Sequence, residues 1–323
     1  MDKTAFLKLI EYLKGKRVFV QTHNFPDPDA IGSGFGLLGI LKHYGIEAVL
    51  CYVGQIDRVN MLRMMKLCDI EIFAEDALPV EMRESDPVIC IDSQKDGGNI
   101  RDLPGDEIAC IDHHPKASDV KYRYSDIRIV GSCCTLIAEY YKELGIEPDE
   151  HTATAMLYGM KMDTLHFTRG VTLKDIEMYG FLFPHANADN LTELTTNSME
   201  FKDLQAYASA IDDISVYGRT GFAGIPFACT DAQLAVVADF ILSLEEVEVA
   251  VLFAKRDDGI KFSVRSETPS VHAGKLIAGA LAGIGNGGGH AFMAGGFIPK
   301  EKTSLLGESP EEAIKERFLR DKI

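Results

Sequence analysis

The stretch Val18-Phe19-Val20-Gln21-Thr22-His23-Asn24-Phe25-Pro26-Asp27-Pro28-Asp29-Ala30-Ile31-Gly32-Ser33 combines an apolar run with a polar turn. The apolar, β-branched run predicts a buried strand, and the glycine-rich apolar segment after the turn predicts a helix. In α/β sheets such turns lie at the carboxyl end of the strands, where ligands bind. Carboxylates beside an imidazole suit a divalent ion such as Mn²⁺, Mg²⁺, Fe²⁺ or Zn²⁺. The alternative is that Asp27 and Asp29 only shape the turn and cap the helix.

Two later apolar runs, 87–91 and 107–111, end in the same way. The first leads into Asp92 and the second into Asp112-His113-His114. Both are nearly continuous in apolar residues, as expected of strands that are covered on both faces of a parallel sheet. A further aspartate, Asp163, follows a predicted helix. This recurrence predicts that the acidic residues share one site at the carboxyl edge of the sheet.

The order of these elements predicts an α/β fold of two domains. We expect a parallel-sheet N-terminal domain with flanking helices over 1–190, and a smaller α/β domain over 221–323. A connector with a helix would occupy 191–220, because 185–197 is polar and aperiodic. The active site is expected in the cleft between the two domains.

Composition excludes several classes of function. The chain has 323 residues, a net charge of −16, 46% hydrophobic residues and 25% charged residues. This acidity argues against a broad electrostatic grip on long nucleic acid, although bound metal ions can reverse the local sign for a small phosphorylated substrate. No apolar run is long enough for a membrane span. The seven cysteines lack metal-binding spacing and suit a reducing compartment, so we expect a cytoplasmic protein.

The candidate ligands outnumber what one zinc ion needs. Four carboxylates and two imidazoles exceed the roughly four ligands of a tetrahedral Zn²⁺ site. They suit two octahedral ions roughly 3.5–4 Å apart that share a carboxylate, which lower the pKa of a bridging water and stabilise a phosphoryl transition state. The chemistry therefore indicates phosphoester or phosphoanhydride hydrolysis. The candidates are His23, Asp27, Asp29, Asp92, His113 and Asp163.

The second predicted domain contains the run Gly285-Asn286-Gly287-Gly288-Gly289-His290. Consecutive glycines expose backbone N–H groups that can cradle a phosphate. Arg265, at the end of a predicted strand, could add a charged donor. The alternatives are a flexible glycine loop and a solvated arginine.

These motifs, in this order, resemble those of the DHH family of phosphoesterases. The first set is His23-x-x-Pro26-Asp27-x-Asp29-Ala30-x-Gly32-Ser33, then Asp92, Asp112-His113-His114 and Asp163. The second set, Ser263-x-Arg265-Ser266, Gly287-Gly288-Gly289-His290 and Gly295-Gly296, resembles the DHH-associated substrate domain. The resemblance covers nearly the whole chain. It is strongest to the short two-domain branch of the RecJ-like superfamily, with nanoRNases, 3′-phosphoadenosine 5′-phosphate phosphatases and cyclic-dinucleotide phosphodiesterases.

The resemblance implies a role for each motif residue. Two Mn²⁺ ions, or Mg²⁺ or Co²⁺, would be bound: one by His23, Asp27 and Asp92, and the second by Asp29, Asp92, His113 and Asp163. Asp112 would orient a ligating histidine, and His114 would face the substrate phosphate as a proton donor. The substrate would be held by Arg265, Ser266, Gly287, Gly288, Gly289 and His290.

The expected function is a metal-dependent hydrolase, a nanoRNase-like exonuclease that releases mononucleotides from very short oligonucleotides and linear dinucleotides. 3′-Phosphoadenosine 5′-phosphate is a further expected substrate. The alternatives are a cyclic-dinucleotide phosphodiesterase, a pyrophosphatase or exopolyphosphatase, and a catalytically silent nucleotide-binding regulator. Neither long nucleic acid nor a membrane is expected as a partner, and a homodimer stays open.

The chain departs from the family pattern at two places. Pro28 stands between the paired aspartates and should stiffen the turn. Leu165 and His166 stand where small residues are commoner, which leaves base preference and substrate length open. A packed or solvent-facing role for His166 is favoured over a role as an additional ligand.

Overall fold

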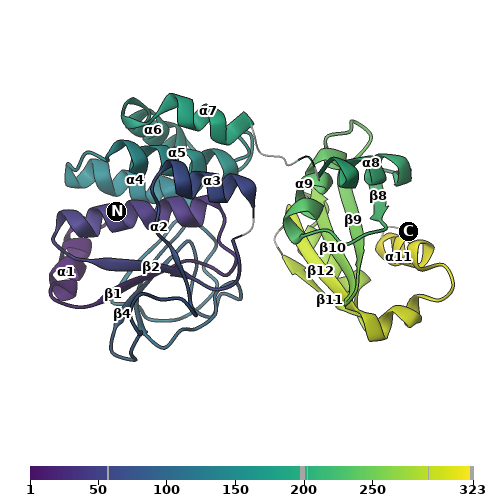
Figure 1. Ribbon diagram of the computed structural model, residues 1–323, viewed down its shortest axis with the longest axis horizontal. Coiled ribbons are helices and arrows are strands. Elements are labelled where there is room, and N and C mark those ends of the chain that lie inside the picture. The colour runs from purple at the N-terminus through teal and green to yellow at the C-terminus, as the bar shows by residue number, and fades with distance from the viewer. Residues whose placement is uncertain (57, 197–200, 202, 290, 321–323) are drawn as a thin grey trace. The chain divides into compact units, whose positions relative to one another are not determined.

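The structure, a computed structural model, describes residues 1–56, 58–196, 201, 203–289 and 291–320 (Figure 1). The chain divides into two compact units, Met1–Ser198 and Met199–Ile323. The division falls within the segment that the sequence assigned to the connector. Among the described residues, no helix is long and apolar enough to span a membrane.

The first unit contains a six-stranded parallel sheet in the order β3-β2-β1-β4-β5-β6, which confirms the predicted α/β architecture. In this doubly wound order the chain proceeds outward from β1 in one direction and then from β4 in the other, and ligands bind outside the carboxyl ends at that switch. Residue 91 ends the central strand β4, whose five residues are all buried. The strands are β1 (Val18–Gln21), β2 (Ala48–Tyr52), β3 (Phe73–Ala74), β4 (Pro87–Ile91), β5 (Asp106–Asp112) and β6 (Tyr124–Ile127).

Helices α2 and α4 contact the strands of this sheet, and α5 packs on α2 and α4 (Figure 1). The glycines of α2 permit its close packing. A Cβ on Gly32 would lie 2.8 Å from the Ala155 carbonyl oxygen, and one on Gly36 would lie 2.7 Å from Met156 Sδ. The helices are α1 (Lys3–Leu13), α2 (Pro28–His43), α3 (Val59–Leu67), α4 (Cys133–Leu144), α5 (Glu150–Asp163), α6 (Leu173–Leu182), the 3₁₀ turn η1 (Phe183–His185) and α7 (Ala188–Thr196).

Helix α7 corrects the prediction that 185–197 is aperiodic, as far as its described residues go. The helix buries Leu191 and Leu194, three positions apart on one face. The Asn187 side chain accepts a hydrogen bond from the Asn190 amide at 2.9 Å and caps its start. Two leucines and an N-cap residue in an otherwise polar segment are too weak a pattern to predict a helix from the sequence.

The second unit contains a six-stranded mixed sheet in the order β11-β12-β10-β9-β8-β7, in which only the β8–β9 pair is parallel. Alternate residues of β9 enter two different apolar clusters, so helices cover both faces. The strands are β7 (Ser215–Tyr217), β8 (Thr220–Ile225), β9 (Val249–Arg256), β10 (Gly259–Ser266), β11 (Asn286–Gly289) and β12 (Met293–Pro299). The helices are α8 (Asp203–Asp213), α9 (Asp231–Leu242), α10 (Ala273–Ala280), the 3₁₀ helix η2 (Lys300–Leu306) and α11 (Pro310–Leu319).

Candidate metal centre and active site

The parallel sheet brings the predicted ligands of the first unit to one edge. His23 follows β1 by two residues, Asp92 follows β4 directly, and His113 follows β5 directly. Asp29 lies in the first turn of α2, and Asp163 is the last residue of α5. Because parallel strands end at the same edge, residues far apart in sequence meet there.

The first ligand group consists of His23, Asp27 and Asp92, whose ligand atoms lie within 4.8 Å of one another. His23 Nε2 is 3.9 Å from Asp27 Oδ1 and 3.7 Å from Asp92 Oδ2. His23 Nδ1 lies 2.9 Å from the carbonyl oxygen of Asn24. A proton on Nδ1 therefore satisfies that carbonyl and leaves the Nε2 lone pair facing the carboxylates, the arrangement typical of metal-binding histidines.

The second ligand group consists of Asp29, His113 and Asp163. His113 Nε2 is 3.3 Å from Asp163 Oδ2 and 3.9 Å from Asp29 Oδ2. Its Nδ1 lies 3.1 Å from the carbonyl oxygen of Val130, so this imidazole too is oriented through a backbone carbonyl.

Asp92 lies between the two groups and offers one oxygen to each. Oδ2 faces His23, and Oδ1 is 3.3 Å from His113 Nε2. Asp92 is 2% exposed, and its Oδ1 accepts no hydrogen bond from the described residues. Its backbone has a φ of 56°, a left-handed conformation that few residues other than glycine adopt. A buried carboxylate oxygen without a donor is costly unless a cation neutralises it, so the donor set fits divalent ions.

Asp29 is held in place from the start of α4. Its carboxylate accepts hydrogen bonds from the amides of Cys133 at 2.6 Å and Cys134 at 2.9 Å. These amides begin the helix, where the positive end of the helix dipole favours an anion. Both cysteine amides escaped sequence reasoning, although Ser132, a favourable N-cap residue, signalled the helix start.

Burial and the crowding of several carboxylates dominate the electrostatics of the cluster. Burial and then the charge of Asp92 raise the pKa of Asp29 well above its ordinary value. Burial raises the pKa of Asp163 to about 6, against the opposing effect of His113. Burial would lower the pKa of His23, but the bond and charge of Asp27 outweigh it and raise this pKa to about 10. Bound cations would relieve these carboxylates of their mutual repulsion.

Asp112 contacts a histidine, but not one of the two oriented by backbone carbonyls. Its Oδ1 is 2.8 Å from His114 Nδ1, and its Oδ2 accepts a hydrogen bond from Gln94 Nε2 at 2.7 Å. The pair therefore fixes the ring of His114, whose Nδ1 is also 3.6 Å from Asp92 Oδ1. Gln94 is a further residue of the site that the sequence did not reveal, because nothing in its local context marks it.

The loop after Asp163 has an uncommon backbone. Leu165, His166 and Phe167 have φ values of 45°, 55° and 65°, three consecutive non-glycine residues in the left-handed region. Leu165 and His166 are exposed, and His166 belongs to none of the candidate ligand groups found among the described residues. This placement agrees with the solvent-facing interpretation of His166.

In the second unit, Arg265 is already paired. Its Nε donates a hydrogen bond to Asp239 Oδ1 at 2.6 Å, and Nη1 donates to Ser263 Oγ at 3.2 Å. The Arg265 side chain is 12% exposed, and Ser266 is buried. The sequence did not predict this pairing of Asp239 with Arg265, a residue that was expected to bind the substrate.

The glycine run forms an edge strand, β11, rather than the loop that the sequence suggested. Gly287 and Gly288 pair with Gly296 and Gly295 of β12. A Cβ on Gly289, at φ 147°, would lie 2.6 Å from the Cα of Ala294, so the strand requires glycine there. An edge strand leaves backbone N–H groups unpaired on its outer side, which suits an anion. His290 lies outside the described residues, and the predicted cleft between the units stays a prediction.

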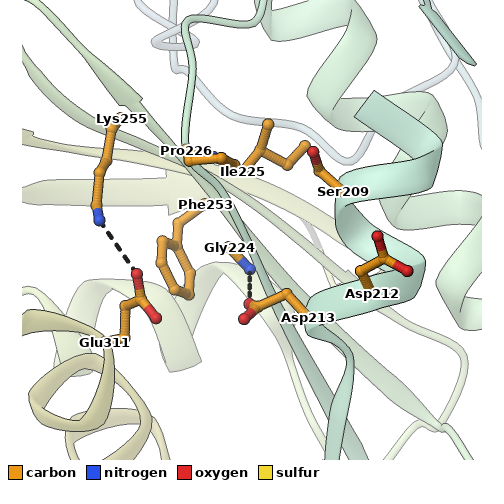
Figure 2. Close-up of a pocket in the computed structure, with 9 residues that line it drawn as sticks. All are labelled: Ser209, Asp212, Asp213, Gly224, Ile225, Pro226, Phe253, Lys255 and Glu311. Atoms are coloured by element: carbon orange, nitrogen blue, oxygen red, sulfur yellow. Dashed lines mark hydrogen bonds and ion pairs between the residues drawn. The ribbon is translucent and has the colours of Figure 1, made fainter. Parts of the chain in front are cut away.

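A cavity of about 300 Å³ also lies in the second unit (Figure 2). Lys255 Nζ is 3.1 Å from Glu311 Oε1, and Asp213 accepts a hydrogen bond from the amide of Gly224 at 2.6 Å. None of the predicted site residues lines this cavity. Because these polar groups already satisfy one another, we assign it no ligand.

Fold and geometry together define an α/β protein with a candidate two-ion centre at its sheet switch point. Two families match: "DHH family, N-terminal domain" over residues 17–160 and "DHHA1 domain" over residues 219–316. The chain carries a DHH N-terminal domain and a DHHA1 domain, as its motifs predicted.

Two relatives that align along most of this chain are hydrolases of phosphoester bonds. The bifunctional oligoribonuclease and PAP phosphatase NrnA of Thermus thermophilus is 26% identical, covering 94% of this chain and 90% of the relative. NrnA of Bacillus subtilis is 24% identical, covering 87% and 89%. An uncharacterized protein of Methanocaldococcus jannaschii is 28% identical, covering 97% of this chain and 66% of its own length. The predicted class, a hydrolase of phosphoester bonds, is thereby confirmed.

The fold has a close counterpart among solved structures. An exopolyphosphatase-related protein from Bacteroides fragilis aligns with a TM-score of 0.81 over 99% of this chain and 97% of that one. The identity is 19%, so this likeness concerns the fold alone.

Proposed function

We propose that this chain is a two-metal-ion, Mn²⁺-dependent phosphoesterase that hydrolyses linear dinucleotides and very short oligonucleotides to mononucleotides. The observation that carries the proposal is Asp92, whose two buried oxygens face two separate groups of carboxylates and imidazole. One ion would be held by His23, Asp27 and Asp92. The other would be held by Asp29, Asp92, His113 and Asp163.

When bound, two such ions lower the pKa of a bridging water and stabilise the charge that develops on a transferring phosphoryl group. The protein's own part is orientation. The carbonyls of Asn24 and Val130 fix the two imidazoles, and the α4 amides fix Asp29. Asp112 fixes His114 beside the cluster, where its imidazole can give a proton to the leaving oxygen.

The preference for short substrates rests on charge and on the second unit. With a net charge of −16, the chain is not expected to attract a long polyanion along its surface. Arg265, Ser266 and the residues 287–290 would hold a terminal phosphate or nucleotide. The two NrnA relatives are named bifunctional oligoribonuclease and PAP phosphatase, which supports short oligoribonucleotides and 3′-phosphoadenosine 5′-phosphate as substrates of this chain. We place the enzyme in the cytoplasm, since its seven cysteines are all free and buried.

A parallel substrate panel tests the proposal. Purified protein with Mn²⁺ is offered linear dinucleotides, cyclic dinucleotides, a twenty-residue RNA, pyrophosphate and 3′-phosphoadenosine 5′-phosphate. We expect the highest kcat/KM on linear dinucleotides, and a chelator should abolish turnover. Equal rates on the dinucleotide and the long RNA, or a preference for the cyclic dinucleotide or pyrophosphate, would overturn the assignment.

A further inference from the structure

Phe25 is an exposed aromatic residue inside the loop that carries the first ligand group. It is 66% exposed, although it lies two residues from both His23 and Asp27. Its φ of 54° places it in the left-handed region, an uncommon conformation for a bulky residue. The fold therefore accepts an uncommon backbone conformation at a residue whose apolar ring stays mostly exposed to water.

The ring rests on Gly54, just after β2. A Cβ on Gly54 would lie 2.7 Å from two of the ring carbons of Phe25, so any larger residue would displace the ring. Gly54 itself has a φ of 99°, which only glycine adopts readily. The loop with Phe25 and the loop with Gly54 thus each contain a residue with a left-handed backbone. Gly54 contacts one side of the Phe25 ring, and the rest of the ring is exposed.

Backbone hydrogen bonds fix this loop at the carboxyl edge of the sheet. The Phe25 amide donates to the carbonyl oxygen of Val53 at 2.8 Å, and the Asn24 amide donates to that of Asn99 at 2.7 Å. The Asn24 carbonyl in turn meets His23 Nδ1. The backbone that carries the ring is therefore fixed two residues from His23, a member of the first ligand group.

We propose that Phe25 is a stacking platform for a nucleobase of the substrate whose phosphate reaches the metal centre. A rigid, solvent-exposed ring that is seated on one side suits the flat apolar face of a base. Aromatic stacking is sequence-tolerant and contributes at each base in single-stranded recognition. This inference rests on the proposed function and adds to it a recognition element in the first unit, apart from Arg265 and the glycine strand.

The test compares Phe25→Asn, which tolerates the left-handed backbone, with Phe25→Tyr, which keeps a ring. Phe183→Ala is the control, because Phe183 is 53% exposed in the same unit but lies outside the ligand loops. The substrates are a diadenosine dinucleotide and its counterpart with one abasic sugar. Elemental analysis of all variants verifies that metal content is unchanged.

We expect Phe25→Asn to lose about 5- to 150-fold more kcat/KM on the adenine substrate than on the abasic one, chiefly through KM. Phe25→Tyr and Phe183→Ala should behave like the unchanged protein. In a binding experiment, a dinucleotide with 2-aminopurine should lose its fluorescence quenching in Phe25→Asn. Equal losses on both substrates, or unchanged quenching, would overturn the stacking role. Failure of the unchanged protein to hydrolyse any dinucleotide would instead refute the proposed function, and the quenching experiment would still decide the role of Phe25.

Discussion

Asp175 is a buried carboxylate whose removal should disturb the metal centre from a distance. It is fully buried in α6, and its oxygens accept hydrogen bonds from the amides of Gly131 and Thr172 at 3.0 and 2.6 Å. The hydroxyl groups of Thr135 and Thr172 donate to it as well. Gly131 follows Val130, whose carbonyl orients His113. The Asp175 carboxylate therefore stabilises the loop whose Val130 carbonyl orients the imidazole of His113.

The magnitude of the effect follows from those four donors. In Asp175→Ala the Thr135 hydroxyl can turn to Ser132 Oγ, which already lies 3.0 Å from it. The hydroxyl of half-buried Thr172 can turn to water. The two amides cannot turn. The buried Gly131 amide without an acceptor costs about 1–3 kcal/mol, and the part-buried Thr172 amide costs less because water can reach it. We expect Asp175→Ala to lower the free energy of unfolding by about 1–4 kcal/mol. Asp175→Asn keeps one acceptor oxygen and should lose less.

Denaturant unfolding and manganese titration of the folded protein test this reasoning together. In Asp175→Asn we expect weaker metal binding by about 10-fold or more, the usual effect of losing the support of a ligating histidine. Glu177→Ala, an exposed change on the same helix, is the control. If Asp175→Asn weakened folding but left metal affinity unchanged, the link through Gly131 and Val130 to His113 would be refuted.

Three further predictions concern the ligands, the second unit and the left-handed loop. Asp92→Ala should abolish activity more completely than any other ligand change, because its two oxygens face His23 of one group and His113 of the other. Two tightly bound ions in this variant, by elemental analysis, would contradict a role of Asp92 in holding both ions. Arg265→Ala should lower kcat/KM on a dinucleotide by about 10–150-fold, the effect of a charge-assisted bond, and far less on bis-(p-nitrophenyl) phosphate. Equal losses on the two esters would assign Arg265 to the fold. Leu165→Gly should raise the melting temperature by about 1–4 °C, because glycine relieves the left-handed strain at an exposed site; an unchanged or lower value would show that Leu165 is not strained.

The sequence alone predicted the parallel sheet, the positions of its apolar strands along the chain and the edge at which the acidic residues gather. These features depend on residues that are close together in the sequence. A continuous apolar run predicts a buried strand, and the residue after the run lies at the carboxyl edge of the sheet. For this reason Asp92 and His113 were identified as neighbours before any tertiary contact was known, whereas Asp163 ends a helix and is outside this rule. The motifs also gave the family, because residue types at fixed spacing survive in the sequence.

The tertiary structure decided which groups hold those residues in place. Asp29 meets the amides of Cys133 and Cys134, and His113 meets the carbonyl of Val130. Every residue carries such backbone groups, so no side-chain pattern reveals which of them will meet a ligand across a hundred residues of chain. The pairing of Arg265 with Asp239 and the conversion of the glycine run into strand β11 have the same origin. Each depends on a neighbour that only the packed sheet supplies, whereas sequence spacing reports only what lies along the chain.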